Sequence, residues 1–435
     1  MNLYKKAVAI IIMCIVCMVG SVSVAQNMNP SNLSNSPYNR YGYGKLSSLG
    51  NAVTRSMGDV GIAIRSNEYT NLSNPASLTA IDTLTMIFST GLNGQYGSYA
   101  EGDLRGHNWD AGFGYMSFHF PLWKDFAMSL SLTPYSAVGY YYGSQDKLPI
   151  QSPVNKHDSL STASAYSGLG GINNFMMGIG WRFLRQKMNE ASIGVNAGFL
   201  FGTINHEAML STSSQSSGTY VMHEMDARGM MLSMGLQYTH RFDATRSMTI
   251  GALFQPKMDF NVDTHQMKYS NDTVQVSQRY RGEIQTPMKW GAGFTYEISR
   301  KLTVTAEYEA TKWSEVNGLD ADMTVDASAF NDVNRFALGM QYQPKTMSRS
   351  FFQTCRYRMG FSTQSNYMRV KDATLREYSL TAGMSLPVNR RSALDFGVGY
   401  TRLQPSANNL VKEDYLTFTL GITFNEMMFF RNKLR

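Results

Sequence analysis

The chain has 435 residues, and its 39 lysines and arginines against 32 aspartates and glutamates give a formal net charge of +7. Only 16% of the residues are charged, whereas 12% are aromatic. The positive charge is weak and spread along the chain, which excludes the basic stripe or patch of a nucleic-acid-binding protein. A high aromatic content is typical of strands, so the composition favours a β-rich protein.

The first 25 residues have the pattern of a secretory signal peptide. Lys5 and Lys6 precede an apolar run, Ala7–Val19, and the small residues Ser23-Val24-Ala25 follow it. A positive head, a short apolar core and a small-residue exit predict cleavage after Ala25. An N-terminal transmembrane anchor is the alternative, but a spanning helix needs about 20 apolar residues. We therefore expect export beyond the inner membrane.

Residues 26–83 do not alternate as a strand does and are rich in glycine, serine and asparagine. They are too polar to span a membrane, yet Met57, Val60, Ile62 and Ile64 give this segment apolar side chains to bury. We expect a folded hatch, or plug, inside the structure that the rest of the chain builds. A disordered periplasmic tail is the alternative.

From residue 84 onward the chain alternates between apolar and polar residues. In KLTVTAEYEATKW, residues 301–313, the side chains of Leu302, Val304 and Tyr308 point one way, and those of Glu307 and Glu309 point the other. This period of two predicts β-strands. Fourteen such segments lie near residues 84–97, 107–120, 124–142, 169–183, 190–206, 219–241, 246–262, 280–298, 301–313, 333–343, 354–370, 374–387, 391–403 and 413–425. A boundary error in one hairpin would give twelve or sixteen.

A soluble β-sandwich shows the same alternation, but three features favour a transmembrane barrel. The segments run for roughly 11 to 18 residues, where soluble strands average about five or six. Short connections such as Ser299-Arg300 alternate with long ones such as residues 144–168, as periplasmic turns and external loops do in outer-membrane barrels. The signal peptide provides the export. We therefore predict an all-β fold, a transmembrane antiparallel β-barrel of about 14 strands over residues 84–435, with residues 26–83 as an N-terminal hatch in the lumen.

Three motifs follow one another along the chain. Asn74-Pro75-Ala76 precedes the first strand, and Thr133-Pro134-Tyr135 lies in the third. TPMKWGAGFTY, residues 286–296, is followed by a strand that closes on Trp313-Ser314. Together they resemble the hatch turn, the kinked third strand and the late hairpin of the FadL/TodX-type outer-membrane transporters of hydrophobic compounds. The start SPYNRYGYG, residues 36–44, and the chain end differ from that family's pattern.

The resemblance implies that Asn74-Pro75-Ala76 is the tip of the plug and lies against the third strand. A proline lacks a backbone N–H, so Pro134 breaks a ladder hydrogen bond. Lipid supplies no partner for the unpaired groups, which the plug tip would cover. The expected gate and ligand path therefore consists of Asn74, Pro75, Ala76, Thr133, Pro134 and Tyr135. A harmless bend at Pro134 is the alternative.

No pattern for catalysis or metal binding stands out. The seven histidines are scattered, and no Gly-x-Ser-x-Gly nucleophile motif occurs. Asp320, Asp322 and Asp326 lack the twelve-residue calcium loop that ends in glutamate. By alternation Glu307 and Glu309 face the lumen, where charge is ordinary in barrels. We expect no catalytic residue, no metal and no cofactor.

Two functions fit this reading. The first is a channel in the Gram-negative outer membrane that takes up hydrophobic compounds such as long-chain fatty acids by passive diffusion, with lateral exit through the wall. Its partners would be outer-membrane lipid and hydrophobic small molecules, and no nucleic acid. The alternative is a non-conducting barrel subunit of an outer-membrane secretion or assembly complex, similar to the shuttle barrel of the type IX secretion system, with other outer-membrane proteins as partners. In both cases the chain itself is expected not to be an enzyme.

Overall fold

The computed structural model describes residues 36–40, 42–149, 159–212, 218–270, 273–299, 301–316, 318–319, 325–326, 330–345, 348, 350–370, 373–389, 391–407 and 410–427. The expected signal peptide lies outside these residues. The wall strands are β2 (Thr85–Glu101), β3 (Leu104–Trp123), β4 (Phe126–Pro149), β5 (Ser159–Arg185), β6 (Asn189–Thr212), β7 (Thr219–Arg241), β8 (Ser247–Gln255), β9 (Met258–Ser270), β10 (Thr273–Thr286), β11 (Met288–Ile298), β12 (Leu302–Lys312), β15 (Val333–Tyr342), β16 (Arg356–Ser365), β17 (Leu375–Pro387), β18 (Ala393–Pro405) and β19 (Lys412–Met427).

The remaining elements are short. They are the 3₁₀ turns η1 (Pro37–Arg40), η2 (Pro75–Ala80) and η3 (Trp313–Glu315), the helical turns α2 (Ala52–Arg55) and α3 (Phe351–Thr354), and the strands β1 (Lys45–Leu46), β13 (Gly318–Leu319) and β14 (Val325–Asp326). Within the described residues, no helix has the length and apolar character needed to cross a membrane.

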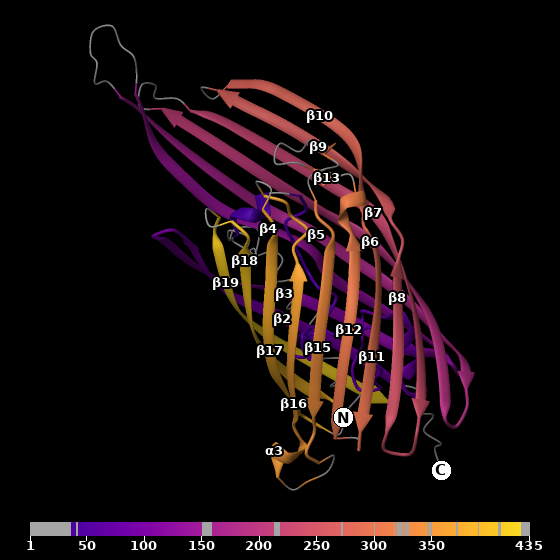
Figure 1. Cartoon of the computed structure of the whole chain (residues 1–435). Coiled ribbons are helices and arrows are strands. Elements are labelled where there is room, and N and C mark those ends of the chain that lie inside the picture. Colours follow the sequence, from indigo (N-terminus) through magenta and orange to yellow (C-terminus); the bar gives the residue numbers. More distant parts are fainter. Residues whose placement is uncertain are drawn as a thin grey trace, which may run out of the picture.

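The wall strands form one antiparallel sheet that closes on itself where β19 pairs with β2 (Figure 1). Pro256 separates β8 from β9 and Pro287 separates β10 from β11, because a proline cannot donate to the ladder. Each of these pairs is one wall strand with a break. The wall thus has fourteen strands, and the predicted all-β barrel is confirmed.

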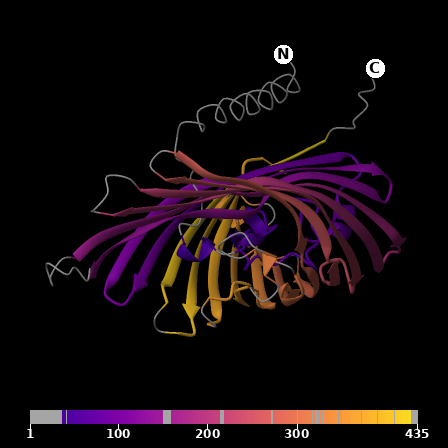
Figure 2. The ribbon, with the colours of Figure 1, turned by 90° about the horizontal axis from the view of Figure 1, so that it is seen from above.

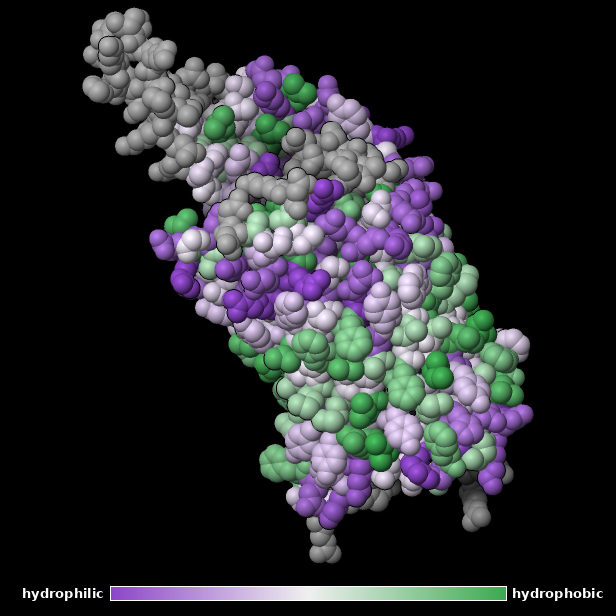
Figure 3. Space-filling view, viewed as in Figure 1, coloured by the Kyte–Doolittle hydropathy of each residue, from purple (hydrophilic) through white to green (hydrophobic). Residues whose placement is uncertain are grey.

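The alternation seen in the sequence gives the wall two different faces. On β12, Val304 and Tyr308 point outward and are each 40% exposed, whereas Thr305 and Glu307 point inward and are buried. Hydrophobic residues gather in a belt over the lower half of the wall in Figure 3, with hydrophilic residues above it. An outward apolar band around a polar interior is the pattern of an outer-membrane barrel.

The wall is taller on one side. In Figure 1, β4 to β7, β9 and β10 rise beyond the other strands, toward the top of the view. The β4–β5 ladder continues to Pro149 and Ser159, although the sequence predicted a loop over residues 144–168. Strands beyond the membrane have water on both faces, so they need no apolar alternation. Because long connections are external in such barrels, this tall end is the external end.

A seam opens in the wall between β3 and β4. The two strands pair from Trp123 and Phe126 only as far as Met116 and Leu132. Beyond that level β3 pairs with β2 and β4 pairs with β5. We call the space between the separated upper parts of β3 and β4 the seam. Part of its β4 side is covered by β1, which pairs with Ser136 and Ala137.

The described residues between 36 and 83, which we call the N-terminal segment, run inside the ring of strands (Figure 2). Inward-facing glycines of the wall make room for them. A Cβ added at Gly251 would overlap the Ile62 carbonyl oxygen, and one at Gly360 would overlap the backbone nitrogen of Gly58. The backbone of the segment therefore lies directly on the wall at these points.

An arginine on the outer face should cost far more than one on the inner face. Phe418 points outward in the apolar belt, and its neighbour Thr419 lines a cavity inside the barrel. We expect Phe418→Arg to lower the free energy of unfolding by about 2–4 kcal/mol and Thr419→Arg to lower it much less. Denaturant unfolding in lipid vesicles measures both, and equal losses would contradict the assignment of the two faces.

Candidate functional site

A buried ion pair fastens the N-terminal segment to the wall. Glu307 is 4% exposed, and its carboxylate accepts hydrogen bonds from the backbone N–H groups of Gly61 at 2.8 Å and Ile62 at 3.0 Å. Its other oxygen lies 2.7 Å from the guanidinium of Arg335 on β15. Arg335 in turn donates to the carbonyl oxygens of Gly58–Asp59 at 2.6 and 2.8 Å. One carboxylate and one guanidinium thus satisfy both donors and acceptors of an irregular backbone.

Glu309, two residues further along β12, continues the row of charges. Its carboxylate lies 2.9 Å from the amine of Lys289 and 3.9 Å from the guanidinium of Arg335. The structure places both Glu307 and Glu309 in the lumen. Two carboxylates and two cationic side chains therefore form a charge-balanced row across β11, β12 and β15.

A second clamp holds the segment on β6. The Arg65 guanidinium lies 3.5 Å from the Glu190 carboxylate and donates to the hydroxyls of Ser192 at 3.2 Å and Thr79 at 2.9 Å. Burial lowers the pKa of Arg65 to about 10, and the neighbouring Glu190 opposes this shift. Arg65 remains a cation at neutral pH, so this clamp is charged too.

The Asn74-Pro75-Ala76 turn forms as its residue types dictate. Asn74 caps η2, and its side-chain oxygen accepts the N–H of Ala76 at 3.0 Å while Pro75 stands at the first helical position. The Asn74 amide also donates to the carbonyls of Ile62 at 2.7 Å and Ala252 at 3.2 Å. A Cβ added at Gly194 of β6 would overlap the carbonyl carbon of Pro75. The turn is therefore fixed on β6 to β8.

The expected contact between Pro134 and Asn74-Pro75-Ala76 is wrong. Pro75 lies against Gly180, which pairs with Ala127 near the start of β4, whereas Pro134 pairs with Asn173 further along the ladder. The β4–β5 ladder shifts register between Pro134 and Ser136, as a proline in a sheet predicts. The chain that meets β4 here is β1, because the Ser47 N–H donates to the Tyr135 carbonyl at 2.9 Å. The turn reaches β4 through Leu78, which packs with Ala127 near the start of that strand.

Thr133, Pro134 and Tyr135 form the β4 side of the seam. Thr133 points inward and is buried, and Tyr135 is half-buried against the hydrophobic core. Pro134 lines a cavity of about 240 Å³ together with residues of β1. The structure therefore brings these three residues together with Lys45 and Leu46, and separates them from Asn74-Pro75-Ala76.

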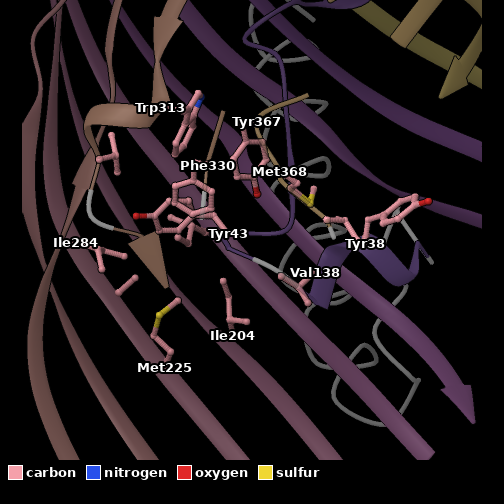
Figure 4. Packing of buried hydrophobic residues seen from close by; sticks show 14 of the residues in the cluster. Tyr38, Tyr43, Val138, Ile204, Met225, Ile284, Trp313, Phe330, Tyr367 and Met368 are labelled. Carbon is pink, nitrogen blue, oxygen red and sulfur yellow. The ribbon is translucent and has the colours of Figure 1, made fainter. Parts of the chain in front are cut away.

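An aromatic cluster lies in the lumen toward its external end. Tyr43, 1% exposed, lies with its ring centre 6.1 Å from Phe260, 5.6 Å from Trp313 and 5.8 Å from Phe330. The Tyr367 ring lies 4.7 Å from Trp313, and its hydroxyl donates to the Gly44 carbonyl. Figure 4 shows the rings of Tyr43, Trp313, Phe330 and Tyr367 gathered at one place. We call these five residues the aromatic cluster.

Glycines on both sides of Tyr43 are required to insert its ring. Gly42 and Gly44 have φ angles of +62° and +77°, in the left-handed region that favours glycine. A Cβ at Gly42 would stand 2.8 Å from the Phe330 ring, and one at Gly44 would stand 2.5 Å from the Ala137 carbonyl oxygen. In the sequence this stretch stands out only as a difference from the FadL/TodX pattern, and no local pattern indicates that Tyr43 enters an aromatic cluster.

Charged side chains line the space that remains in the lumen. The 240 Å³ cavity is bordered by Lys45, Arg55 and Asp59, and a second cavity of about 350 Å³ by Lys289, Glu309 and Arg335 among others. Sites for small apolar ligands are lined mainly by hydrophobic and aromatic side chains. Within the described residues, no group of three or more His, Cys, Asp or Glu is placed to hold a metal ion.

Comparisons with known proteins agree on the fold. A family model described as BamG matches residues 5–435, and no curated protein matches the chain. The barrel is similar to the toluene transporter TbuX of Ralstonia pickettii, at 16% identity and a TM-score of 0.56 over 86% of this chain and 98% of that one. It is also similar to the toluene transporter TodX of P. putida, at 14% identity and 0.56 over 88% and 100%.

A FadL homologue of Pseudomonas aeruginosa is similar as well, at 12% identity and a TM-score of 0.55 over 88% of this chain and 99% of that one. The FadL/TodX resemblance seen in the sequence is thereby confirmed at the level of the fold. The chain is a multi-pass β-barrel of the outer membrane.

Removing the Glu307 carboxylate should release the N-terminal segment. Glu307→Ala leaves the Arg335 guanidinium buried without its main counter-ion, a change that typically costs about 3–5 kcal/mol. We expect trypsin to cut after Arg55 and Arg65 in the variant, while the folded wild-type barrel resists.

Lys312→Gln is the matched control, because Lys312 also lies on β12 but its ion pair with Asp332 is partly exposed. Pairs of this kind contribute little to stability, so this variant should resist trypsin as the wild type does. Equal resistance of Glu307→Ala and the wild type would show that the ion pair does not hold the segment.

Proposed function

The chain belongs to the BamG family, and we propose that it is a non-conducting outer-membrane barrel that serves as a subunit of an outer-membrane secretion or assembly complex. Residues 26–83 act in this proposal as a permanent plug. The observation that carries it is the way the segment is held in the lumen: ionic clamps fasten it to the wall, and the aromatic cluster packs Tyr43 between residues of the wall and its loops toward the external end. A barrel closed in this way offers its surface and not its lumen.

The chemistry of the closure supports a static role. Moving residues 58–62 off the wall would leave the Glu307–Arg335 pair to be solvated again and would unpair four backbone groups. Breaking a buried ion pair and its hydrogen bonds costs several kcal/mol. Thermal motion would therefore open such a lumen rarely. In this reading the partners are other outer-membrane proteins, and the chain carries out no reaction.

Uptake of hydrophobic compounds is the second candidate, and the seam is the observation that favours it. The similar structures are toluene transporters and a FadL homologue. In this proposal a compound such as a long-chain fatty acid passes by passive diffusion and leaves sideways at Thr133, Pro134 and Tyr135. The aromatic cluster would have to move aside, and the compound would have to cross the charged cavities. Asn74-Pro75-Ala76 would anchor the plug on β6 to β8, on the same side of the barrel as the seam.

Conductance and uptake separate the two candidates. We expect the purified full-length protein to give no steady ion conductance in a planar lipid bilayer. A variant that lacks residues 36–83 should conduct, because fourteen strands enclose a lumen too wide for side chains to fill. Vesicles that contain the intact barrel should take up radiolabelled toluene or oleate no faster than protein-free vesicles.

Steady conductance by the intact barrel, or uptake that Pro134→Val reduces, would reject the closed barrel and favour lateral transport. Gentle extraction of the barrel from its own membrane supplies the positive test. We expect an assembly of defined stoichiometry with other outer-membrane proteins.

A further inference from the structure

Beyond the level of β1, β4 presents an edge that no strand of the described residues occupies. Its pairing with β3 stops at Leu132, and β1 covers only Ser136 and Ala137. From Val138 to Gly143, the ladder partners of β4 in the described part of the chain lie on β5. A strand edge carries backbone donors and acceptors that another strand can pair with.

The backbone groups that face this edge can be identified. The Tyr135 carbonyl accepts the Ser47 N–H at 2.9 Å, so Tyr135 directs its backbone toward β1 and the edge. In an antiparallel strand every second residue directs its backbone to the same neighbour. The ladder between β4 and β5 shows no register shift after Ser136. Gly139 and Tyr141 therefore direct their N–H and C=O groups to the open edge.

The described N-terminal segment packs on the inner face of β4 at this level but forms no ladder pair with it beyond β1. Tyr38 lies in one cluster with Val138 and Tyr140, and the Arg40 guanidinium donates to the Tyr142 hydroxyl at 3.3 Å. The left-handed glycines on both sides of Tyr43 carry the chain from β1 into the aromatic cluster. Further toward the N-terminus, the Ser36 hydroxyl donates to Glu413 of β19 at 2.6 Å. From the aromatic cluster to Ser36 the segment therefore runs along the inner face of β4 to β19, and its ladder pairing with β4 ends at Ala137.

The free edge also lacks the features that usually protect such edges. Natural edge strands carry charges, prolines or bulges that discourage pairing with other chains. Residues 138–143, VGYYYG, contain none of these, and Tyr141 is 79% exposed on the outer side. By contrast, β10, on the other side of the tall wall, carries Arg279, Arg281 and Glu283. Aromatic residues favour strand pairing, and two glycines let another backbone approach closely.

We propose that the β4 edge at Val138–Gly143 accepts an extended segment of another outer-membrane protein as an added strand. This inference rests on the proposed function as a complex subunit and names its docking site. The occupant that fits is an uncharged strand rich in β-branched or aromatic residues, which pairs with the backbone of Gly139 and Tyr141 and packs on the Tyr141 ring. Such strand addition continues, with a partner's chain, the pairing that β1 begins.

Two substitutions at Tyr141 distinguish the contribution of the edge-facing backbone from that of the side chain. Tyr141→Pro removes the edge-facing N–H and leaves the ladder with β5 intact, whereas Tyr141→Thr removes the ring and keeps the N–H. Native mass spectrometry of each tagged protein, extracted in mild detergent, measures the fraction that carries the partner. We expect Tyr141→Pro to lower that fraction at least about tenfold, the effect of about 1.4 kcal/mol of lost binding, and Tyr141→Thr to keep most of it.

Hydrogen exchange on the unmodified protein gives a second readout that does not depend on the folding of a variant. The amides of Gly139 and Tyr141 should exchange slowly in the assembly and fast in the isolated barrel, while the β5-facing amide of Tyr140 is protected in both. Fast exchange at Gly139 and Tyr141 within an intact assembly would overturn the docking site and leave the proposed function standing.

Three further outcomes count against the inference. Protection of the two amides in the isolated barrel would show that lipid or this chain itself covers the edge. An assembly with the mass of two copies of this chain would show that a second copy, and not another protein, occupies the edge. Absence of any stoichiometric assembly would reject the proposed function itself.

Discussion

The contact between Glu307, Arg335 and the backbone of residues 58–62 is the interaction on which the interior depends. Fourteen strands enclose more space than inward side chains can fill, so an additional segment has to occupy it. An irregular segment brings unpaired N–H and C=O groups, which are costly to bury without partners. The carboxylate and the guanidinium supply those partners from two adjacent strands. The glycines of the wall then let the backbone come close enough to use them.

The same fold can serve a transporter or a closed barrel, because the function resides in what fills the lumen and not in the number of strands. Here the segment crosses from β19 at Ser36, through the aromatic cluster, to the wall strands on the opposite side. Charged side chains of the segment and of the wall line the remaining cavities. An apolar solute would lose contact with lipid there and gain little in exchange. A lateral route would use the seam in the described wall, and β1 covers part of its β4 side.

Much of the fold could be predicted from the sequence because a strand with lipid on one face and a polar interior on the other must alternate. The sequence KLTVTAEYEATKW therefore predicts both the strand itself and the inward direction of Glu307. The partner of Glu307 was not found, because Arg335 lies 28 residues away and meets it only through the register of β12 with β15. The upper halves of β4 and β5 were missed because water on both faces removes the alternation.

The local conformations at Pro75 and Pro134 could be predicted from the sequence, but their positions relative to each other could not. Each proline acts locally as expected, one as the first residue of a capped turn and the other at a register shift. Their mutual placement depends on Gly194 and on the position of β1, which no local pattern encodes. Tyr43 is similar, because its burial requires Trp313 and Tyr367 from distant loops.

In a closed barrel the N-terminal segment is a fixed part of the fold. Hydrogen exchange at the amides of Gly61 and Ile62, measured on the intact protein in lipid, tests it most directly. These amides donate to Glu307, so they should exchange as slowly as the ladder amides of β12. Exchange at the rate of an unstructured peptide, with β12 still protected, would show that the segment leaves the wall and that the barrel is not closed.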